Sequence, residues 1–218
     1  DIKAVSFVGC TYVGTHVYNR SSLAGKRVQC MMGAKNHGIV MPDANKEQTL
    51  NAITGAAFGA AGQRCIALPV LVGEAQSWLP ELIEKAKTMK VNAGCQEGTE
   101  VGPVISKQAL ARITDLIDSG IKEGATCDLD GRNPQVPGFE QGNFIGPTIF
   151  SNVSTDMRIY KEEIFGPVLC VMQADNIEQA IELINDNPNG NCTAIFTRSV
   201  ATARRFQEYI DVGQVGIN

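Results

Sequence analysis

Residues 62–65, Gly-Gln-Arg-Cys, combine the residue types of a nucleophilic site. A cysteine thiolate attacks carbonyl carbons, and a neighbouring guanidinium favours the ionised thiol. Cys65 follows a run of small residues and stands at a predicted turn into an apolar strand. We therefore expect this turn to present Cys65 at the edge of a sheet, where α/β proteins bind ligands. The alternative is a buried structural cysteine.

Two other segments have the composition of nucleotide-binding loops. Residues 9–14 (GCTYVG) follow a predicted strand and open a predicted helix, so their backbone N–H groups could hold a phosphate. Residues 161–167 (KEEIFGP) place two acids before a predicted central strand, where a carboxylate could bind ribose hydroxyls. The structural alternatives are an ordinary strand–turn–helix and a solvated loop.

Other catalytic patterns are weak or missing. His16 and His37 are the two histidines, and a Cys–His hydrolase would need one of them as its base. We expect both to be structural or surface residues, because His16 falls in a predicted helix and His37 begins an apolar strand. No metal-ligand spacing occurs, and neither GxGxxG nor GxxxxGK[ST] is present. We therefore predict no metal site.

Composition excludes several classes of protein. The 218 residues include 19 Lys and Arg against 23 Asp and Glu, a net charge of −4, so nucleic acid and anionic membranes are poor candidate partners. No apolar run approaches the ~18 residues of a membrane span. Seven scattered cysteines favour reduced intracellular thiols. The sequons at Asn19, Asn152 and Asn191 leave a secreted glycoprotein as the alternative.

Periodicity predicts an α/β fold with a largely parallel sheet flanked by helices. Expected strands cover residues 4–9, 26–32, 37–41, 66–72, 126–129, 148–150, 167–172, 194–197 and 214–218. Expected helices cover residues 11–19, 44–61, 77–90, 106–123, 177–184 and 200–209. In the second helix, Ala52, Ala56 and Ala60 form a row of small residues beside Gly55 and Gly59, which predicts a close approach to another backbone. The alternative is a buried packing helix. Residues 131–146 are expected to be irregular.

Four motifs, in this order and at these separations, resemble the aldehyde dehydrogenase superfamily. They are residues 7–14, 62–65, 162–168 and 187–190. Within that superfamily, residues 32–37 (MGAKNH) and 58–65 (FGAAGQRC) resemble its CoA-acylating methylmalonate-semialdehyde branch. The resemblance covers essentially the whole chain.

The resemblance implies an NAD-dependent enzyme with Cys65 as nucleophile. In the family, the cysteine forms a thiohemiacetal with the aldehyde, and loss of hydride to NAD leaves a thioester. Glu163 and Phe165 match the positions that hold the nicotinamide ribose and ring. Gly9 and Gly14 match the turn near the pyrophosphate. Cys10 stands where the family usually has serine, and a thiol is the weaker hydrogen-bonding group.

Residues 30–35 (CMMGAK) bear on the second half of the reaction. Hydrolytic members carry a glutamate at the position of Met31, and a thioether cannot take a proton from water. The resemblance therefore implies transfer of the acyl group to coenzyme A. Arg64 could clamp the carboxylate of malonate or methylmalonate semialdehyde, which would yield acetyl-CoA or propionyl-CoA with loss of CO₂. Alternatively, Arg64 pairs with a structural acid.

Three readings of function remain open at this point. They are a CoA-acylating semialdehyde dehydrogenase, a hydrolytic NAD-dependent aldehyde dehydrogenase, and a non-catalytic member of the same fold. The segment between Cys65 and Gly73 is about two residues shorter than the family pattern and contains Pro69, so we expect a shortened or bulged strand after Cys65.

The resemblance also implies a domain division. Residues 1–33 would end the NAD-binding domain, 34–215 would form the catalytic domain, and 216–218 would lead toward an oligomerisation region. The chain begins at Asp1 without Met and ends in a strand-like run, so we expect a fragment with little activity of its own. The expected whole is a homotetramer. It would lie in the mitochondrial matrix of a eukaryote or in the cytoplasm of a bacterium.

Overall fold

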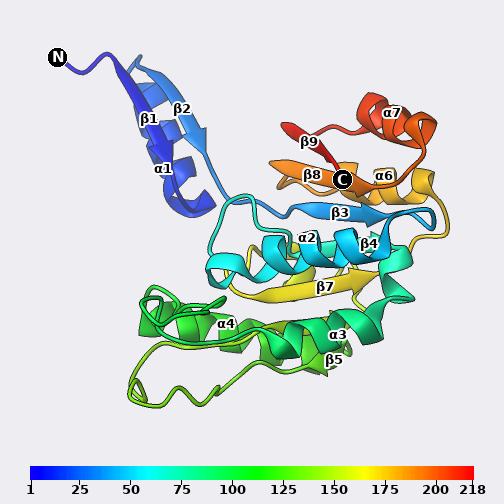
Figure 1. Cartoon of the computed structure of the whole chain (residues 1–218). Helices are drawn as coiled ribbons and strands as arrows, with labels where there is room; N and C mark the ends of the chain where they lie inside the picture. The colour runs from blue at the N-terminus through cyan, green and yellow to red at the C-terminus, as the bar shows by residue number, and fades with distance from the viewer. The chain divides into compact units, whose positions relative to one another are not determined.

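The computed structural model describes every residue from Asp1 to Asn218 and divides the chain into two units, Asp1–Ala34 and Lys35–Asn218 (Figure 1). The first unit is a strand–helix–strand element made of β1 (Ala4–Val8), α1 (Thr11–Leu23) and β2 (Arg27–Met31). Its two strands are parallel, with Ala4 opposite Arg27. These elements agree with the strand, helix and strand predicted for this part of the chain.

The second unit is built on a seven-stranded sheet in the order β5-β6-β7-β4-β3-β8-β9. All neighbouring strands are parallel except the β5–β6 pair, which is antiparallel. The strands are β3 (His37–Val40), β4 (Val70–Gly73), β5 (Thr126–Leu129), β6 (Thr148–Ser151), β7 (Val168–Met172), β8 (Cys192–Phe196) and β9 (Gln214–Ile217). The predicted α/β class with a largely parallel sheet is confirmed.

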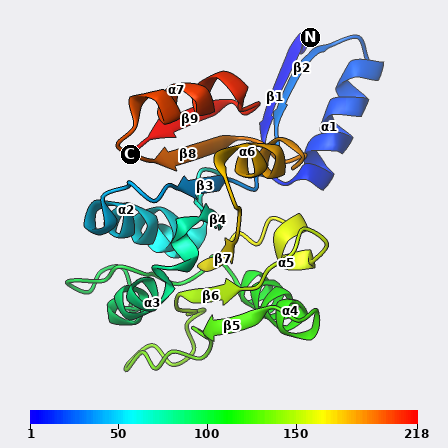
Figure 2. The ribbon, with the colours of Figure 1, turned by 90° about the vertical axis from the view of Figure 1, so that its right-hand side faces the viewer.

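Helices cover both faces of this sheet. They are α2 (Lys46–Phe58), α3 (Leu79–Thr88), α4 (Lys107–Lys122), α5 (Arg158–Lys161), α6 (Ile177–Asn185) and α7 (Val200–Tyr209). Figure 2 shows α2 and α3 on one face and α4, α5 and α6 on the other. In the strand order of the sheet, the connection from β3 to β4 runs toward β5, whereas the connection from β7 to β8 runs toward β9. Right-handed crossovers then place the connecting helices on opposite faces.

Four of these helices begin at a side-chain cap. Asn45, Ser106, Asn176 and Ser199 each accept a hydrogen bond from the backbone N–H three residues further on. Such caps satisfy a helix N–H group that would otherwise lack a partner, and each is worth about 1 kcal/mol. The helix starts are therefore fixed by local sequence.

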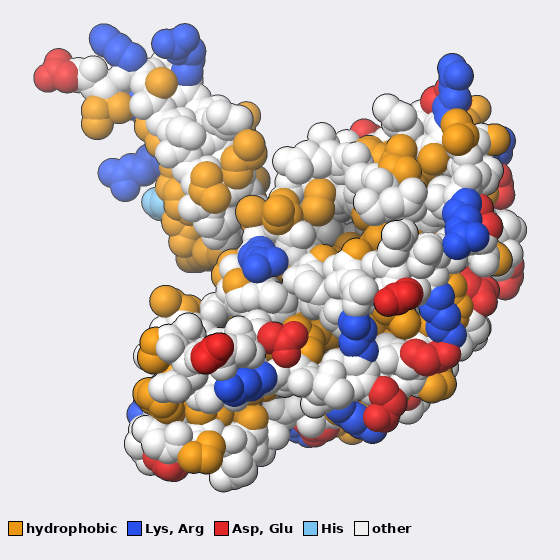
Figure 3. Space-filling model, viewed as in Figure 1, with side chains coloured by type: hydrophobic (Ala, Val, Ile, Leu, Met, Phe, Trp, Pro, Cys, Tyr) orange, Lys and Arg blue, Asp and Glu red, His pale blue; other side chains and the backbone are white.

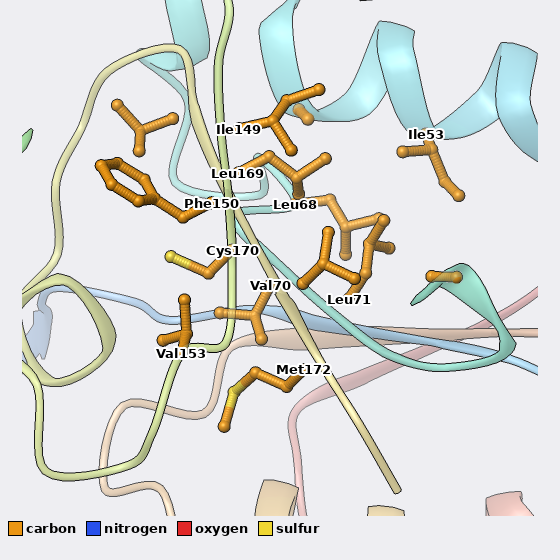
Figure 4. Close-up of a cluster of buried hydrophobic side chains, with 14 of the residues drawn as sticks. Ile53, Leu68, Val70, Leu71, Ile149, Phe150, Val153, Leu169, Cys170 and Met172 are labelled. Atoms are coloured by element: carbon orange, nitrogen blue, oxygen red, sulfur yellow. The ribbon is translucent and has the colours of Figure 1, made fainter. Parts of the chain in front are cut away.

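The core lies on the central strands. Val70, Leu71, Leu169 and Val171 have no exposed surface, as expected for parallel strands covered on both faces. Figure 4 shows buried side chains of β4, β6 and β7 together with Ile53 of α2. Burying each such side chain stabilises the fold by about 1.5–3 kcal/mol.

No helix combines the length and apolarity needed to cross a bilayer.

Charges on the surface are mixed. In Figure 3, basic and acidic side chains alternate over the drawn face of the second unit, and neither sign dominates it. This surface has no basic stripe of the kind that binds nucleic acid.

β4 begins at Val70 rather than at residue 66, because Pro69 has no N–H to donate to a strand ladder, which confirms the shortened strand expected after Cys65. Three other features differ from the predictions. α2 ends at Phe58, and a Cβ built on Gly55 would meet no atom of the chain within 4 Å. The close approach expected for its small residues is therefore wrong within this chain, because the opposite face of α2 packs on the sheet. The short helix α5 was not predicted.

Candidate active site

The candidate site lies along one edge of the second unit's sheet. Cys65 precedes β4, Glu163 and Phe165 precede β7, and Asn191 precedes β8. Because β3, β4, β7 and β8 are parallel, the residues that precede them meet at their common amino edge. Cys65 thus lies in a turn that leads into a strand at the edge of the sheet, which is the placement expected from the sequence.

A left-handed turn delivers Cys65 to this edge. After α2, Ala60 and Ala61 have φ values of 53° and Gly62 has φ of 66°. A left-handed conformation costs an L-residue roughly 1–2 kcal/mol, so the two alanines store strain beside the cysteine. The turn reverses the chain sharply between the buried helix and residues 63–65.

Gly62 also brings the cysteine loop against the loop of Glu163 and Phe165. A Cβ built on Gly62 would lie 2.1 Å from the carbonyl oxygen of Gly166 and 2.9 Å from the nitrogen of Pro167. Only glycine allows such a close approach of two backbones. Two motifs that lie about a hundred residues apart in sequence are thus in backbone contact.

The backbone of Cys65 is held while its side chain stays accessible. Its carbonyl oxygen accepts hydrogen bonds from Nδ2 of Asn36 and from Nδ2 of Asn191, each at 2.9 Å. Asn36 is buried, donates also to the carbonyl of Ala67 at 2.6 Å, and accepts from the N–H of Cys192 at 3.0 Å. Cys65 itself is exposed. A fixed backbone with an open thiol suits a nucleophile.

Arg64 lies against the end of α2. Its Nη1 donates a long hydrogen bond of 3.4 Å to the carbonyl of Gly55, and its guanidinium covers Gly59. A cation is favourable at a helix C-terminus, where the carbonyl groups carry partial negative charge. Arg64 makes no ion pair, so the alternative of a structural acid partner does not hold in this structure.

Two cations hold the segment that carries Glu163 and Phe165. Lys35 Nζ donates to the carbonyls of Ile159 and Glu162 at 2.6 and 2.8 Å. Arg112 donates from Nη1 to the carbonyl of Ile164 at 2.8 Å and from Nη2 to that of Glu163 at 2.6 Å. The segment therefore has a defined path up to Phe165, which has a left-handed φ of 55° and is 42% exposed.

Burial shapes the chemistry of the two basic groups at the start of β3. Desolvation lowers the pKa of Lys35 to about 8 and that of His37 to about 4. His37 is buried, and its Nε2 lies 3.1 Å from the hydroxyl of Tyr160. His37 is therefore a neutral structural residue near pH 7, as expected from the sequence, and His16 is exposed on α1.

The first unit carries the turn at residues 9–14, which the sequence suggested as a phosphate-binding turn. Cys10 is the N-cap of α1 but its side chain makes no capping hydrogen bond, so the first N–H groups of the helix receive no side-chain cap. Uncapped N–H groups at a helix start suit an anion such as a pyrophosphate. The N–H of Gly9 bonds to the carbonyl of Met31 at 3.1 Å, and Met31 ends β2 with 56% of its surface exposed.

Comparison with known proteins settles the family. The family model described as "Aldehyde dehydrogenase family" matches residues 1–218, which is the whole chain. The chain belongs to the aldehyde dehydrogenase family. Its cysteine loop, its KEEIFGP loop and its first strand–helix–strand unit are therefore parts of an aldehyde dehydrogenase polypeptide.

Relatives of this aldehyde dehydrogenase chain include named acylating enzymes. It is 61% identical to the human methylmalonate-semialdehyde/malonate-semialdehyde dehydrogenase [acylating], mitochondrial, over 100% of this chain and 41% of that protein. It is likewise 61% identical to the bovine protein of the same name, over the same shares of the two chains. The chain thus spans about two fifths of the length of these curated relatives.

Solved structures agree with the fold. A methylmalonate-semialdehyde dehydrogenase from Oceanimonas doudoroffii is 43% identical, with a TM-score of 0.96 over 99% of this chain and 45% of that one. A betaine aldehyde dehydrogenase from Staphylococcus aureus, in complex with NAD⁺, is 30% identical, with a TM-score of 0.95 over 99% of this chain and 43% of that one. The backbone of each unit therefore follows an aldehyde dehydrogenase fold.

The sequence analysis missed three residues that build the candidate site. Asn36, Lys35 and Arg112 make these hydrogen bonds with backbone groups, so their partners have no side-chain signature in the sequence. A polar pair directly before the strand predicted at residues 37–41 was the available signal for Lys35 and Asn36, because buried polar groups need partners. Arg112 had no comparable signal, since it lies on the amphipathic helix α4 among other charged residues.

Proposed function

We propose that the aldehyde dehydrogenase containing this chain oxidises malonate or methylmalonate semialdehyde with NAD and transfers the acyl group to coenzyme A. The products would be acetyl-CoA or propionyl-CoA, with loss of CO₂. The observation that carries this proposal is the exposed thiol of Cys65 on a backbone fixed by Asn36 and Asn191, in a chain 61% identical to enzymes named as acylating.

Cys65 would perform the covalent steps. Its thiolate attacks the aldehyde carbon and forms a C–S bond, and loss of hydride converts the adduct to a thioester on Cys65. The carboxylate of the bound acyl group then leaves as CO₂, and the carbon that carried it takes up a proton from solvent. NAD, when bound, supplies the hydride acceptor. The thiolate of coenzyme A then attacks the thioester, and Cys65 leaves as the thiolate. The two amide donors on its carbonyl hold the Cys65 backbone in place through these steps, which limits the orientational cost of each attack.

The residues that would bind NAD are those that match the cofactor positions of the family. Glu163 and Phe165 would hold the nicotinamide ribose and ring, and a carboxylate that accepts hydrogen bonds suits ribose hydroxyls. Gly9, Cys10 and Gly14 would lie at the pyrophosphate, where the uncapped start of α1 supports the proposal. The complex of the Staphylococcus aureus relative with NAD⁺ supports the same cofactor.

Met31 supports coenzyme A rather than water as the acyl acceptor. The chain places a thioether at the position where hydrolytic aldehyde dehydrogenases carry their glutamate, so no carboxylate at this position can activate water. The word "acylating" in the relatives' names agrees with this proposal.

Arg64 would recognise the substrate carboxylate. Its guanidinium makes one long hydrogen bond and no ion pair, so little is lost when it turns toward an anionic substrate beside Cys65. A bidentate pair with the semialdehyde carboxylate would then orient the aldehyde carbon toward the thiol. We further propose a homotetramer, located in the mitochondrial matrix if the source is a eukaryote, since the bovine and human relatives are named mitochondrial.

The test is an NADH assay of the complete polypeptide with malonate semialdehyde, with and without coenzyme A. We expect sustained turnover only with coenzyme A, and none in Cys65→Ala under either condition. Sustained turnover without coenzyme A would replace the proposal with a hydrolytic aldehyde dehydrogenase. An inactive wild type that still binds NAD would indicate a non-catalytic member of the family.

A further inference from the structure

A second cysteine shares the hydrogen-bond network of Cys65. Cys192 begins β8 and is partly buried, and its Sγ lies 3.9 Å from the carbonyl oxygen of Ile66. Its N–H donates to Oδ1 of Asn36 at 3.0 Å, while Nδ2 of the same amide donates to the carbonyl of Cys65 at 2.9 Å. One buried carboxamide therefore bridges the backbones of the two cysteines.

Asn191 tightens this arrangement. Its Nδ2 donates to the carbonyl of Cys65 at 2.9 Å, so the residue immediately before Cys192 contacts the nucleophile directly. Disulfide formation needs the two Cα atoms within about 4.4–6.8 Å, so it requires backbones that are close neighbours. The Cys192 thiol points at the carbonyl of Ile66, the residue directly after Cys65, and therefore lies beside the turn that carries Cys65.

The electrostatic effect of Cys65 on Cys192 agrees with this proximity. Burial, and after it the negative charge of Cys65, raise the pKa of Cys192 to about 11. The charge of one thiolate is thus felt at the other. The remaining cysteines of this unit lie in other surroundings: Cys170 is buried in the core, Cys127 lies on β5, and Cys95 is exposed on a loop.

We propose that Cys65 and Cys192 form a reversible disulfide, which makes this pair a redox modification site at the nucleophile. The oxidant would be a low-molecular-weight disulfide such as oxidised glutathione. Formation of the bond depends only on the arrangement of the two thiols and not on the proposed reaction. Its consequence, reversible loss of dehydrogenase activity, rests on the proposed function.

The exchange proceeds in two balanced steps. The exposed Cys65 thiolate attacks one sulfur of oxidised glutathione, which forms a mixed disulfide and releases one glutathione thiolate. The Cys192 thiol loses its proton to solvent, attacks the Cys65 sulfur and expels the second glutathione thiolate. The two protein thiols are oxidised, and one glutathione disulfide is reduced to two glutathione thiols. Because Cys192 is protonated over most of the physiological range, the second step accelerates as pH rises.

The experiment treats the chain with excess oxidised glutathione at pH 8, blocks the remaining thiols with iodoacetamide and identifies cross-linked peptides by mass spectrometry. We expect a Cys65–Cys192 peptide two hydrogens lighter than its separate parts, the loss of two of the seven free thiols, and full reversal by dithiothreitol. Cys95→Ser is the matched control, and it should form the same cross-link.

Cys192→Ser should stop at the Cys65–glutathione adduct, and Cys192→Ala is the second variant should the serine disturb β8. Circular dichroism establishes that each variant is folded before oxidation. The proposal is overturned if folded wild-type protein retains the glutathione adduct on Cys65 to the same extent as Cys192→Ser. It is also overturned if Cys65 cross-links to Cys95 as readily as to Cys192. Neither result depends on whether the protein oxidises semialdehydes.

Discussion

Gly62 and Gly166 join the two halves of the candidate site. The backbones are so close that a Cβ on Gly62 would lie 2.1 Å from the carbonyl oxygen of Gly166, well inside van der Waals contact. Gly62 follows α2 and precedes the nucleophile loop, and Gly166 ends the loop of Glu163 and Phe165. This one contact fixes the distance between the thiol and the residues proposed to hold the nicotinamide.

Gly62→Ala should destabilise the second unit by about 3 kcal/mol or more, because the methyl group overlaps a backbone carbonyl and the φ of 66° disfavours an L-residue. Gly55→Ala is the matched control: it lies in α2, its Cβ would meet nothing, and it should stabilise by about 0.5–1 kcal/mol. Urea unfolding followed by fluorescence of Trp78, the single tryptophan, reports on this unit. Equal midpoints for the two variants would refute the close contact.

Asn36→Ala should lower the free energy of unfolding by about 3 kcal/mol, since it removes a buried amide with three hydrogen bonds. Asn191→Ala removes one hydrogen bond at a less buried position and should cost about 1 kcal/mol or less. The same urea titration measures both. A larger loss in Asn191→Ala than in Asn36→Ala would show that Asn36 does not organise the cysteine loop.

The free energy of unfolding should decrease as the pH is lowered from about 6.5 to about 4. The pKa of His37 is about 4 in the folded chain and 6.5 when unfolded, so the unfolded state binds more protons in this window. The stability that depends on neutral His37 is fully present at pH 7. It is lost as the pH falls, and the loss reaches up to about 3 kcal/mol. His37→Gln should flatten the pH dependence of the urea midpoint relative to wild type in this window. Superimposable curves would mean that His37 is not buried in its neutral form.

Met31→Glu should introduce turnover without coenzyme A in the complete polypeptide. A carboxylate at this position supplies the base that a thioether lacks, so water can cleave the thioester on Cys65. Met31→Gln has a similar shape but no base, and it should remain dependent on coenzyme A. The measurement is sustained NADH production after the first turnover. Equal rates for the Glu and Gln variants without coenzyme A would exclude this role for position 31.

Much of the fold was predictable because its signals are local. The apolar runs of β3, β4 and β7, the amphipathic period of α4 and the side-chain caps of the helices all act within a few residues. The late start of β4 was also predictable, because Pro69 marks it in the sequence. The end of α2 was not predicted correctly, because it depends on two left-handed alanines, which residue type alone does not indicate.

The sequence by itself determined the α/β class, the family resemblance and the identity of the candidate nucleophile, because each depends on residue types in order. Only the tertiary structure decided that the residues before β3, β4, β7 and β8 share one edge of the sheet. It also decided that the buried amide of Asn36 links Cys65 to Cys192, 127 positions along the chain. The physical reason is that distant segments are joined largely through backbone N–H and C=O groups, both in the sheet and at the amide of Asn36. Nearly every residue carries these groups, so the sequence does not indicate which of them will pair.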